Sequence, residues 1–501
     1  MATRDPELGF EKQLNSYSRV LVVNPLNTYW SYQLTSELAL RSREFTTNVR
    51  WLNVGPKTPR EYEINLGDHY STLKHRMVHR RIAHLLSQSG ISASKNLLKQ
   101  NHSRFSTQLK SIDELGHIQF NQIPLGRMIF SAIASSLKST AFELKDVYGQ
   151  IDFFMWHAHE CYSVISKEIE EFKPDLILTT NDRLIGSAMS LALAKQNRIN
   201  RSLAYWGHST DHIEDYAESL YSGYEWESKI LEHWKKTRNI EYNQAMTKAQ
   251  NDLEQLRRGP NADSAKYLST QIKGTSVDMD SGFCVFYAQS EHEHSGHLIT
   301  NPLERFANQY EAFNALQKVC KELEMPLFLK FHPRRVDEVN VFDRKRLDWE
   351  NLKSNDIVQV IEEESSIDTY ELISKAKYNF VWSSSVGLEC ISRGIAPVIL
   401  GFPNWLNLGW KIHAWNEESI KQKLLTTSTE FDPEKLLPYF YYLNSFGSGC
   451  RFSDRRSIWN YKGSVVELWA LTPLGKLSNV FGRFLIFIEK VVYGSKKSLF
   501  G

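Results

Sequence analysis

The chain has 501 residues, more than one hydrophobic core usually supports, so we expect two or three domains. Hydrophobic residues make up 42% and charged residues 24% of the chain, which excludes a disordered or collagen-like protein. Sixty basic residues against 58 acidic ones leave a net charge of +2, so we expect no general binding to nucleic acid.

The five cysteines lie far apart in the sequence, and no CxxC pair occurs. This pattern favours a reducing compartment, without a disulfide framework or a structural zinc site. The segment MATRDPELGFEKQL lacks the apolar stretch of a secretory signal, and no apolar run approaches the roughly 18 residues that cross a bilayer. We therefore expect a cytoplasmic protein.

The first half of the chain shows alternating strand and helix patterns at its beginning and its end, with a mainly helical stretch between them. A strand over 18–23 (SRVLVV) and a helix from 31 to about 40 predict the start of an α/β unit. Residues from about 60 to 170 place apolar side chains three and four apart, which predicts mainly helices. A strand over 176–179, a helix over 184–196 and a strand over 202–206 then predict a βαβ unit.

A second α/β unit is expected from residue 283 onwards. Short apolar runs alternate there with helical segments, which is typical of a parallel sheet. The expected strands span 283–290, 326–333, 356–361, 378–382 and 397–401, and the expected helices 303–323, 369–376 and 385–393. Beyond residue 402 the chain is aromatic, and we expect helices to the end.

Polar residues follow the strands of this second unit, where ligands bind in open α/β sheets. Ser383, Ser384 and Ser385 come directly after an apolar strand and open a helix. Free backbone N–H groups and hydroxyls there favour an anion, although the serines would equally serve as helix caps. Glu389 falls on the same helix face as Ser385, either to accept hydrogen bonds from ribose hydroxyls or as a solvated residue.

His332 ends another apolar run of the same unit. Pro333 restricts His332 to an extended conformation, and Arg334 adds positive charge. An imidazole in this position can bind a phosphate. The alternative is a capped strand end with surface arginines.

Two stretches carry a resemblance to a known family: NQYEAFNALQKVCKELEMPLFLKFHPR and SSIDTYELISKAKYNFVWSSSVGLECISRGIAPVILG. They resemble bacterial capsule polysaccharide biosynthesis proteins, including the capsule-type Kdo transferases. The HP and serine motifs are also similar to those of polysialyltransferases and CDP-glycerol polymerases. The resemblance is closest over 283–405. It implies an α/β fold of the GT-B type, in which two Rossmann-like domains face a cleft, with a helical insertion in the first domain and C-terminal helices.

The resemblance also implies a division of the chain and a set of donor-binding residues. Residues 1–278 would form the acceptor-side domain with its insertion at about 60–170, and 279–440 the nucleotide-sugar domain. The remaining segment, 441–501, would be helical and pack on the first domain or on a membrane. The implied contacts to the donor come from two motifs and one loop, namely His332, Pro333, Arg334, Ser383, Ser384, Ser385, Glu389, Ser290 and Glu291. A CMP-linked donor is favoured, and no other cofactor is expected.

The catalytic residues should come from the first domain. Glycosyl transfer needs a carboxylate or histidine near the reacting carbon and neutralisation of the leaving phosphate. Asp182 and His208 follow neighbouring expected strands. Asp182 would act as nucleophile or base and His208 as a proton relay, although Asp182 would also suit a helix N-cap. Relatives have a QHG-like element where this chain has WGHS, at 206–209.

Two further segments have weaker signals. EHEHSGH (291–297) carries three histidines, but in an expected loop without the spacing of a metal site, so we expect no metal. Residues 473–501 hold five basic residues and one acidic residue among bulky apolar ones. That composition suits an interfacial helix on anionic lipid, or a terminal helix on the first domain.

Taken together, these features predict a glycosyltransferase of surface or capsular polysaccharide synthesis. It would transfer a sugar, with Kdo as a candidate, from a CMP-linked donor to a glycan or lipid-linked acceptor, at the inner face of the plasma membrane. One alternative is a CDP-polyol phosphotransferase of the teichoic-acid type. Another is a catalytically silent GT-B module that binds glycan.

Overall fold

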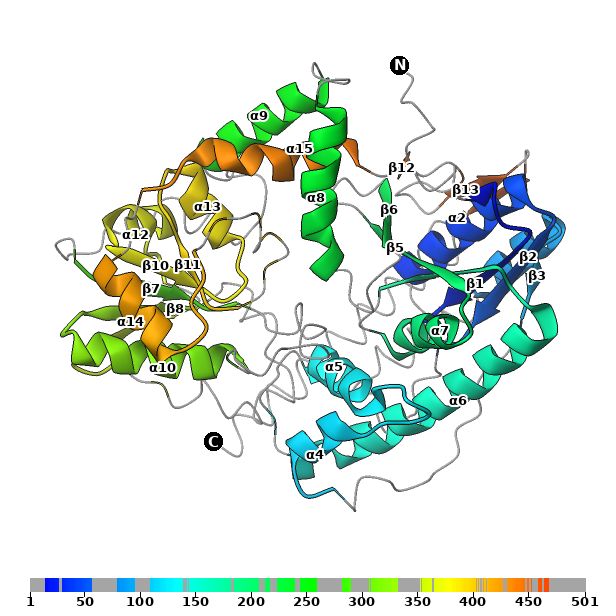
Figure 1. Ribbon diagram of the computed structural model, residues 1–501, viewed down its shortest axis with the longest axis horizontal. Coiled ribbons are helices and arrows are strands. Elements are labelled where there is room, and N and C mark those ends of the chain that lie inside the picture. Colours follow the sequence, from blue (N-terminus) through cyan, green and yellow to red (C-terminus); the bar gives the residue numbers. More distant parts are fainter. Residues whose placement is uncertain are drawn as a thin grey trace, which may run out of the picture.

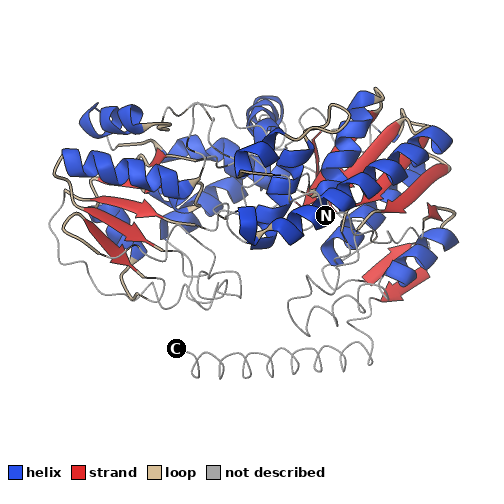
Figure 2. Ribbon diagram, turned by 90° about the horizontal axis from the view of Figure 1, so that it is seen from below, coloured by secondary structure: helices blue, strands red, loops and turns tan. Residues whose placement is uncertain are grey.

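A computed structural model gives the fold (Figures 1 and 2). The residues that it describes are 14–26, 29–55, 79–94, 109–137, 142, 144–181, 184–206, 212–216, 223–238, 244–258, 282–289, 306, 308–331, 352, 354–362, 365–401, 403, 405, 408, 410, 412–426, 430–446, 448–449, 452, 458–461 and 464–467. In Figure 2 the strands gather towards the two ends of the molecule, with helices between them.

The first sheet has seven strands in the order β12-β6-β5-β4-β1-β2-β3. The five from β5 to β3 run parallel, whereas β6 pairs antiparallel with both β5 and β12. Their bounds are β1 Arg19–Asn24, β2 Asn48–Asn53, β3 Ser92–Ala93, β4 Leu176–Thr180, β5 Asn200–Trp206, β6 His212–Tyr216 and β12 Ser448–Gly449.

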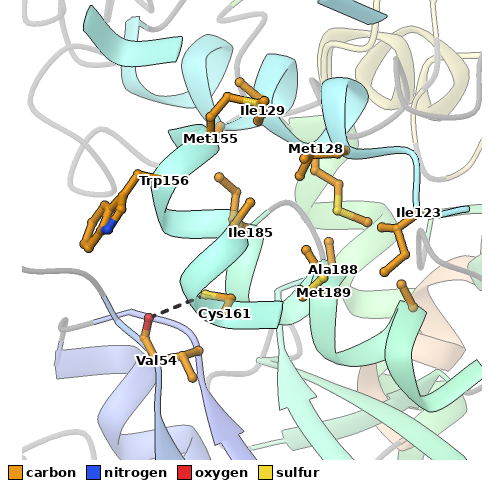
Figure 3. Packing of buried hydrophobic residues seen from close by; sticks show 14 of the residues in the cluster. Val54, Ile123, Met128, Ile129, Met155, Trp156, Cys161, Ile185, Ala188 and Met189 are labelled. Carbon is orange, nitrogen blue, oxygen red and sulfur yellow. Dashed lines mark hydrogen bonds between the residues drawn. The ribbon is translucent and has the colours of Figure 1, made fainter. Parts of the chain in front are cut away.

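Helices cover both faces of this sheet, as the alternation along β1 requires. Val20 and Val22 point into a core with α2, while Leu21 and Val23 point into a core with α5, α6 and α7. Figure 3 shows part of that second core. The helices are α2 Tyr29–Phe45, α4 Ile112–His117, α5 Leu125–Leu137, α6 Tyr148–Phe172 and α7 Ile185–Gln196, with a 3₁₀ turn at Leu144–Asp146.

The second sheet has five strands in the order β11-β10-β7-β8-β9, and every pair is parallel. The strands are β7 Cys284–Tyr287, β8 Leu327–Lys330, β9 Val358–Ile361, β10 Tyr378–Val381 and β11 Val398–Ile399. The helices around it are α10 Gln309–Glu322, α12 Thr369–Lys375, α13 Val386–Ser392 and α14 Glu417–Thr426. Two mainly parallel sheets with covering helices confirm the predicted α/β class.

Three helices lie between the two sheets (Figure 1). They are α8 Gly223–Thr237, α9 Gln244–Arg258 and α15 Leu437–Ser445, the last preceded by a 3₁₀ turn at Pro433–Leu436. The chain then returns to the first sheet, because β12 pairs with β6 and the Phe452 N–H donates to Glu37 Oε2 at 3.0 Å.

The sequence analysis missed several strands. Strand β2 was not anticipated, because the run NVRWLN shows only brief alternation around Arg50, and β3 and β6 were missed as well. The expectation of helices throughout 441–501 is confirmed for 441–445, the end of α15, and is wrong for 448–449, 458–461 and 464–467. Strands β13 (Ile458–Tyr461) and β14 (Ser464–Glu467) form an antiparallel pair there, as their aromatic and β-branched residues favour. None of the helices in the described ranges combines the length and apolar character needed to cross a membrane.

A buried ion pair anchors helix α2 and the returning chain. Arg41 Nε and Glu37 Oε1 are 2.9 Å apart, and both side chains are fully buried. We predict that Glu37→Ala lowers the free energy of unfolding by about 3–5 kcal/mol, because it leaves the Arg41 charge buried without its partner.

Chemical denaturation measures this effect, and a matched control is available. Glu232 pairs with Lys236 at the same i,i+4 spacing on α8, but both side chains are largely exposed. Glu232→Ala should change the stability by less than about 0.5 kcal/mol. Equal losses in the two variants would contradict the importance of burial at Glu37.

Candidate functional site

The carboxyl ends of the second sheet's strands form one row. Tyr287, Lys330 and Ile361 end β7, β8 and β9, and the strand register places them opposite one another. Val381, the last residue of β10, lies opposite Tyr287. Residues that follow these strands therefore meet at a single edge of the sheet, which is where α/β folds bind ligands.

The serine motif occupies this edge directly after β10. Ser383 and Ser384 are buried, each 6% exposed, whereas Ser385 is exposed. Ser384 Oγ accepts a 3.3 Å bond from the Val386 N–H. Ser385 is the N-cap residue of α13 and makes no side-chain capping bond. Ser384 therefore caps the start of the helix, whereas the Ser385 hydroxyl makes no capping bond to it.

Close packing fixes the position of this motif. A Cβ atom on Gly401 would lie 2.5 Å from the Trp382 carbonyl oxygen and 2.9 Å from Ser383 Oγ. A Cβ on Gly387, in the first turn of α13, would lie 2.4 Å from the Trp405 ring. Because only glycine fits at both positions, the serine motif is held against β11 and its helix against Trp405.

Glu389 is not a solvated helix residue. Burial raises the pKa of its carboxyl group to about 7, and the nearby Arg393 only partly opposes the shift. Arg393 stacks over the Tyr370 ring at 4.2 Å and donates from Nη1 to the Glu389 carbonyl oxygen at 3.0 Å. Burial raises the pKa of the Tyr287 hydroxyl, and Cys390 and Glu389 add smaller contributions in the same direction. Glu389 therefore lies where the edge of the sheet meets α12 and α13.

Lys330 is the second unusual group at this edge. It is only 3% exposed, and its Nζ has no hydrogen-bond partner among the residues that the structure describes. Burial lowers its pKa to about 8, opposed by the charge of Asp368. Asp368 is committed to α12, since its Oδ1 accepts bonds from the N–H groups of Tyr370 and Glu371.

The end of β7 is fixed by a reciprocal amide pair. The Gln289 N–H donates to Gln309 Oε1 at 3.1 Å, and Gln309 Nε2 donates to the Gln289 carbonyl oxygen at 2.8 Å. Gln289 Nε2 itself is buried and has no hydrogen-bond partner in the described ranges. The bonds orient the chain as it leaves β7 towards the ligand edge.

Of the predicted site residues, the described structure brings together Ser383, Ser384, Ser385 and Glu389. The others lie outside the described residues and stay predictions, namely Asp182, His208, Ser290, Glu291, His332, Pro333 and Arg334. The histidines of EHEHSGH and the segment 473–501 lie outside them too. Among the residues described, no cluster of three or more His, Cys, Asp or Glu side chains is arranged to hold a metal ion.

Helix α7 begins shortly after Asp182, which itself lies outside the described residues. Helix α7 begins at Ile185, and its N-cap residue is Leu184, which makes no side-chain capping bond. Strand β4 ends just before Asn181, whose φ of 55° is in the left-handed region. The N-cap position of α7 is therefore occupied by Leu184.

The sequence analysis missed Lys330, Tyr370 and Arg393 as members of this edge. A lysine inside LFLKF has no distinctive spacing, and only the strand register shows it beside Tyr287. Arg393 could have been found from its position four residues after Glu389, on the same helix face.

Comparisons with solved structures give distant likenesses. Thermosulfurimonas dismutans KpsC, a beta-Kdo 2,4 transferase, is 13% identical over 53% of this chain and 78% of its own, with a TM-score of 0.34. The beta-Kdo 2,7 transferase of the same organism's KpsC is 14% identical over 63% and 89%, with a TM-score of 0.32. Methanocaldococcus jannaschii UDP-GlcNAc 2-epimerase is 11% identical over 94% and 99%, with a TM-score of 0.24. No protein-family model and no curated protein matches the sequence.

The raised pKa of Glu389 makes a prediction about stability. The folded protein holds this proton up to about pH 7, whereas an ordinary glutamate releases it near 4.5. The stabilisation of the folded protein by this bound proton is therefore complete below pH 4.5 and is lost as the pH rises to 7. In the wild type the free energy of unfolding should fall by about 3 kcal/mol across that window, and Glu389→Gln should abolish this fall.

Unfolding measured from pH 4.5 to 8 in both proteins tests this expectation. Glu418→Gln, at an exposed position in the first turn of α14, is the control and should keep the wild-type profile. If the Glu389→Gln profile ran parallel to that of the wild type, Glu389 would not be the titrating group.

Proposed function

We propose that the chain is a glycosyltransferase of surface or capsular polysaccharide synthesis. In this proposal the second sheet binds a nucleotide-sugar, and the first domain presents a glycan or lipid-linked acceptor. The observation that carries it is the gathering of Ser385, Glu389 and Lys330 at the carboxyl edge of a wholly parallel sheet. The sequence resemblance supplies the class of reaction.

The described groups suit the two polar parts of a nucleotide. A phosphate needs hydrogen-bond donors, which the Ser385 hydroxyl and the Lys330 ammonium can supply. A ribose needs an acceptor for its hydroxyls, and the Glu389 carboxyl group is suited to that role. We favour a CMP-linked donor, with Kdo as the candidate sugar, as the resemblance implies.

The proposed transfer uses residues of both domains. Asp182 acts at the reacting carbon, as nucleophile or base, and His208 moves the proton. His332 and the serine motif neutralise the departing phosphate. Since the leaving group is a monophosphate, we expect no requirement for a chelating metal, and turnover should survive EDTA. The enzyme would work in the cytoplasm, with 473–501 as a candidate contact to the membrane.

A thermal-shift screen with CMP, CDP, UMP, UDP, GDP and ADP tests the nucleotide site. A ligand at 100 times its dissociation constant stabilises the folded state by about 2.7 kcal/mol. We predict selective stabilisation by CMP that is weakened in Ser385→Ala and lost in His332→Ala. Ser385→Ala should leave the melting temperature of the free protein unchanged, because that hydroxyl caps nothing.

The other outcomes of the screen discriminate among functions. A preference for UDP or GDP would overturn the CMP-linked donor. If phosphorus from a CDP-polyol entered the product, the protein would be a polyol phosphotransferase. No response to any nucleotide would favour a silent glycan-binding module.

A second prediction separates binding from chemistry. Asp182→Ala should bind CMP as tightly as the wild type and should not transfer sugar, because it removes only the group at the reacting carbon. Isothermal titration and release of CMP from a CMP-sugar measure the two quantities. Undiminished turnover would remove Asp182 from the catalytic role.

A further inference from the structure

Lys330 is placed where a buried cation has no structural purpose. It ends β8, and its side chain lies on the sheet face that also carries Tyr287 and Val381, beneath α12 and α13. Its exposed fraction is 3%, and the ammonium finds neither a hydrogen bond nor an ion pair with any described residue. An unpaired buried ammonium is costly, so the folded protein carries a destabilising group at this point.

The neighbouring polar groups are already committed. The Tyr287 hydroxyl donates to Asn379 Oδ1 at 2.9 Å, and Asn379 Nδ2 donates to the Ile373 carbonyl oxygen at 3.1 Å. The Asp368 carboxylate caps α12. These bonds hold the surroundings of Lys330 in place without using its three donors.

We infer that Lys330 is a phosphate-binding residue of the ligand site, and that its ammonium is paired by the phosphate of the bound nucleotide. This inference rests on the proposed function, which it deepens by assigning a group to the leaving phosphate. The position supports it, because Lys330 is one of the strand-terminal residues that form the ligand edge. A charge kept unpaired until the ligand arrives is preorganised for it.

The titration of Lys330 agrees with this role. Burial lowers its pKa to about 8, so part of the free protein holds it uncharged at pH 8. A phosphate would restore the charge, and binding should take up a proton. The titratable groups near it are Tyr287, its register partner on β7, and Asp368, the N-cap residue of α12; burial raises the pKa of the Tyr287 hydroxyl.

Lys330→Met provides a test in which two quantities should move in opposite directions. The variant keeps the length of the side chain and removes the buried charge, so the free protein should melt at a temperature about 2 °C higher or more. It should also bind CMP about tenfold more weakly or worse, because the charged hydrogen bond to phosphate is lost. If Lys330 only fills space in the core, the melting temperature should rise without any loss of CMP affinity.

Comparing a nucleotide with its nucleoside locates the contact. Titrations of CMP against cytidine and of UMP against uridine give the gain in affinity from the phosphate. In the wild type this gain should be large, and in Lys330→Met it should shrink by about tenfold or more, with nucleoside binding unchanged. Equal losses for CMP and cytidine would overturn the inference, as would an unchanged gain from the phosphate.

A matched control and a proton measurement complete the test. Lys377 lies at the opposite, amino end of the same sheet, directly before β10, and is exposed. Lys377→Met should alter neither CMP affinity nor stability. Calorimetry at pH 8 in buffers of different ionisation enthalpy should show proton uptake on CMP binding to the wild type, and less to Lys330→Met.

Failure of the proposed function would look different from failure of this inference. If no nucleotide binds the wild type, the proposed function fails, and inorganic phosphate and pyrophosphate become the probes. If these anions stabilise the wild type but not Lys330→Met at constant ionic strength, Lys330 remains an anion-binding residue. Equal stabilisation of the two proteins, or none, would overturn it.

Discussion

The second sheet is buried on both faces, and this constraint decides where the domain can place its chemistry. All its strands run parallel, so the crossovers cover one face with α12 and α13 and the other with α10 and α14. Alternation along β7 sends Phe286 into one core and Val285 and Tyr287 into the other. A polar group in either layer must find a partner there. The carboxyl edge is where polar groups can stay available, and the serine motif, Glu389 and Lys330 all lie at it.

The two buried charged sites of the described structure differ in whether they are paired. Glu37 and Arg41 are fully buried, and they pair with each other and with the returning backbone at Phe452. Lys330 is almost as deeply buried and has no such partner among the described residues. Proteins pair nearly all of their buried polar groups, so the Glu37–Arg41 pair is explained by its contribution to stability alone. The buried Lys330 ammonium lowers stability, and a ligand that pairs with it would explain why it is there.

The sequence predicted the second sheet well, because Pro, Asp and Gly punctuate its short apolar runs, and β8 through β11 lie within the expected ranges. It predicted the first sheet less completely, since β2 has an arginine in its middle and β6 pairs antiparallel with β5 through contacts distant from any local pattern. Helical spacing placed Glu389 near Ser385, but spacing does not measure burial, so the raised pKa had to come from the structure. Lys330 was beyond sequence reasoning, because its significance lies in strand register and in the partner it lacks.

The two sheets also differ at their carboxyl edges, and the difference bears on which one binds a charged ligand. At the end of β1, Asn24 Nδ2 donates to Asn53 Oδ1 at 2.9 Å, and Asn53 Nδ2 lies 3.2 Å from His79 Nδ1. These neutral groups satisfy one another, and burial, together with the charge of Arg80, lowers the pKa of the His79 imidazole and disfavours its charged form. At the second edge the Ser385 hydroxyl does not cap α13, and the Lys330 ammonium has no partner within the described part of the chain. Among these described groups, an unpaired cation lies only at the second edge, which supports the proposed binding of the nucleotide-sugar there.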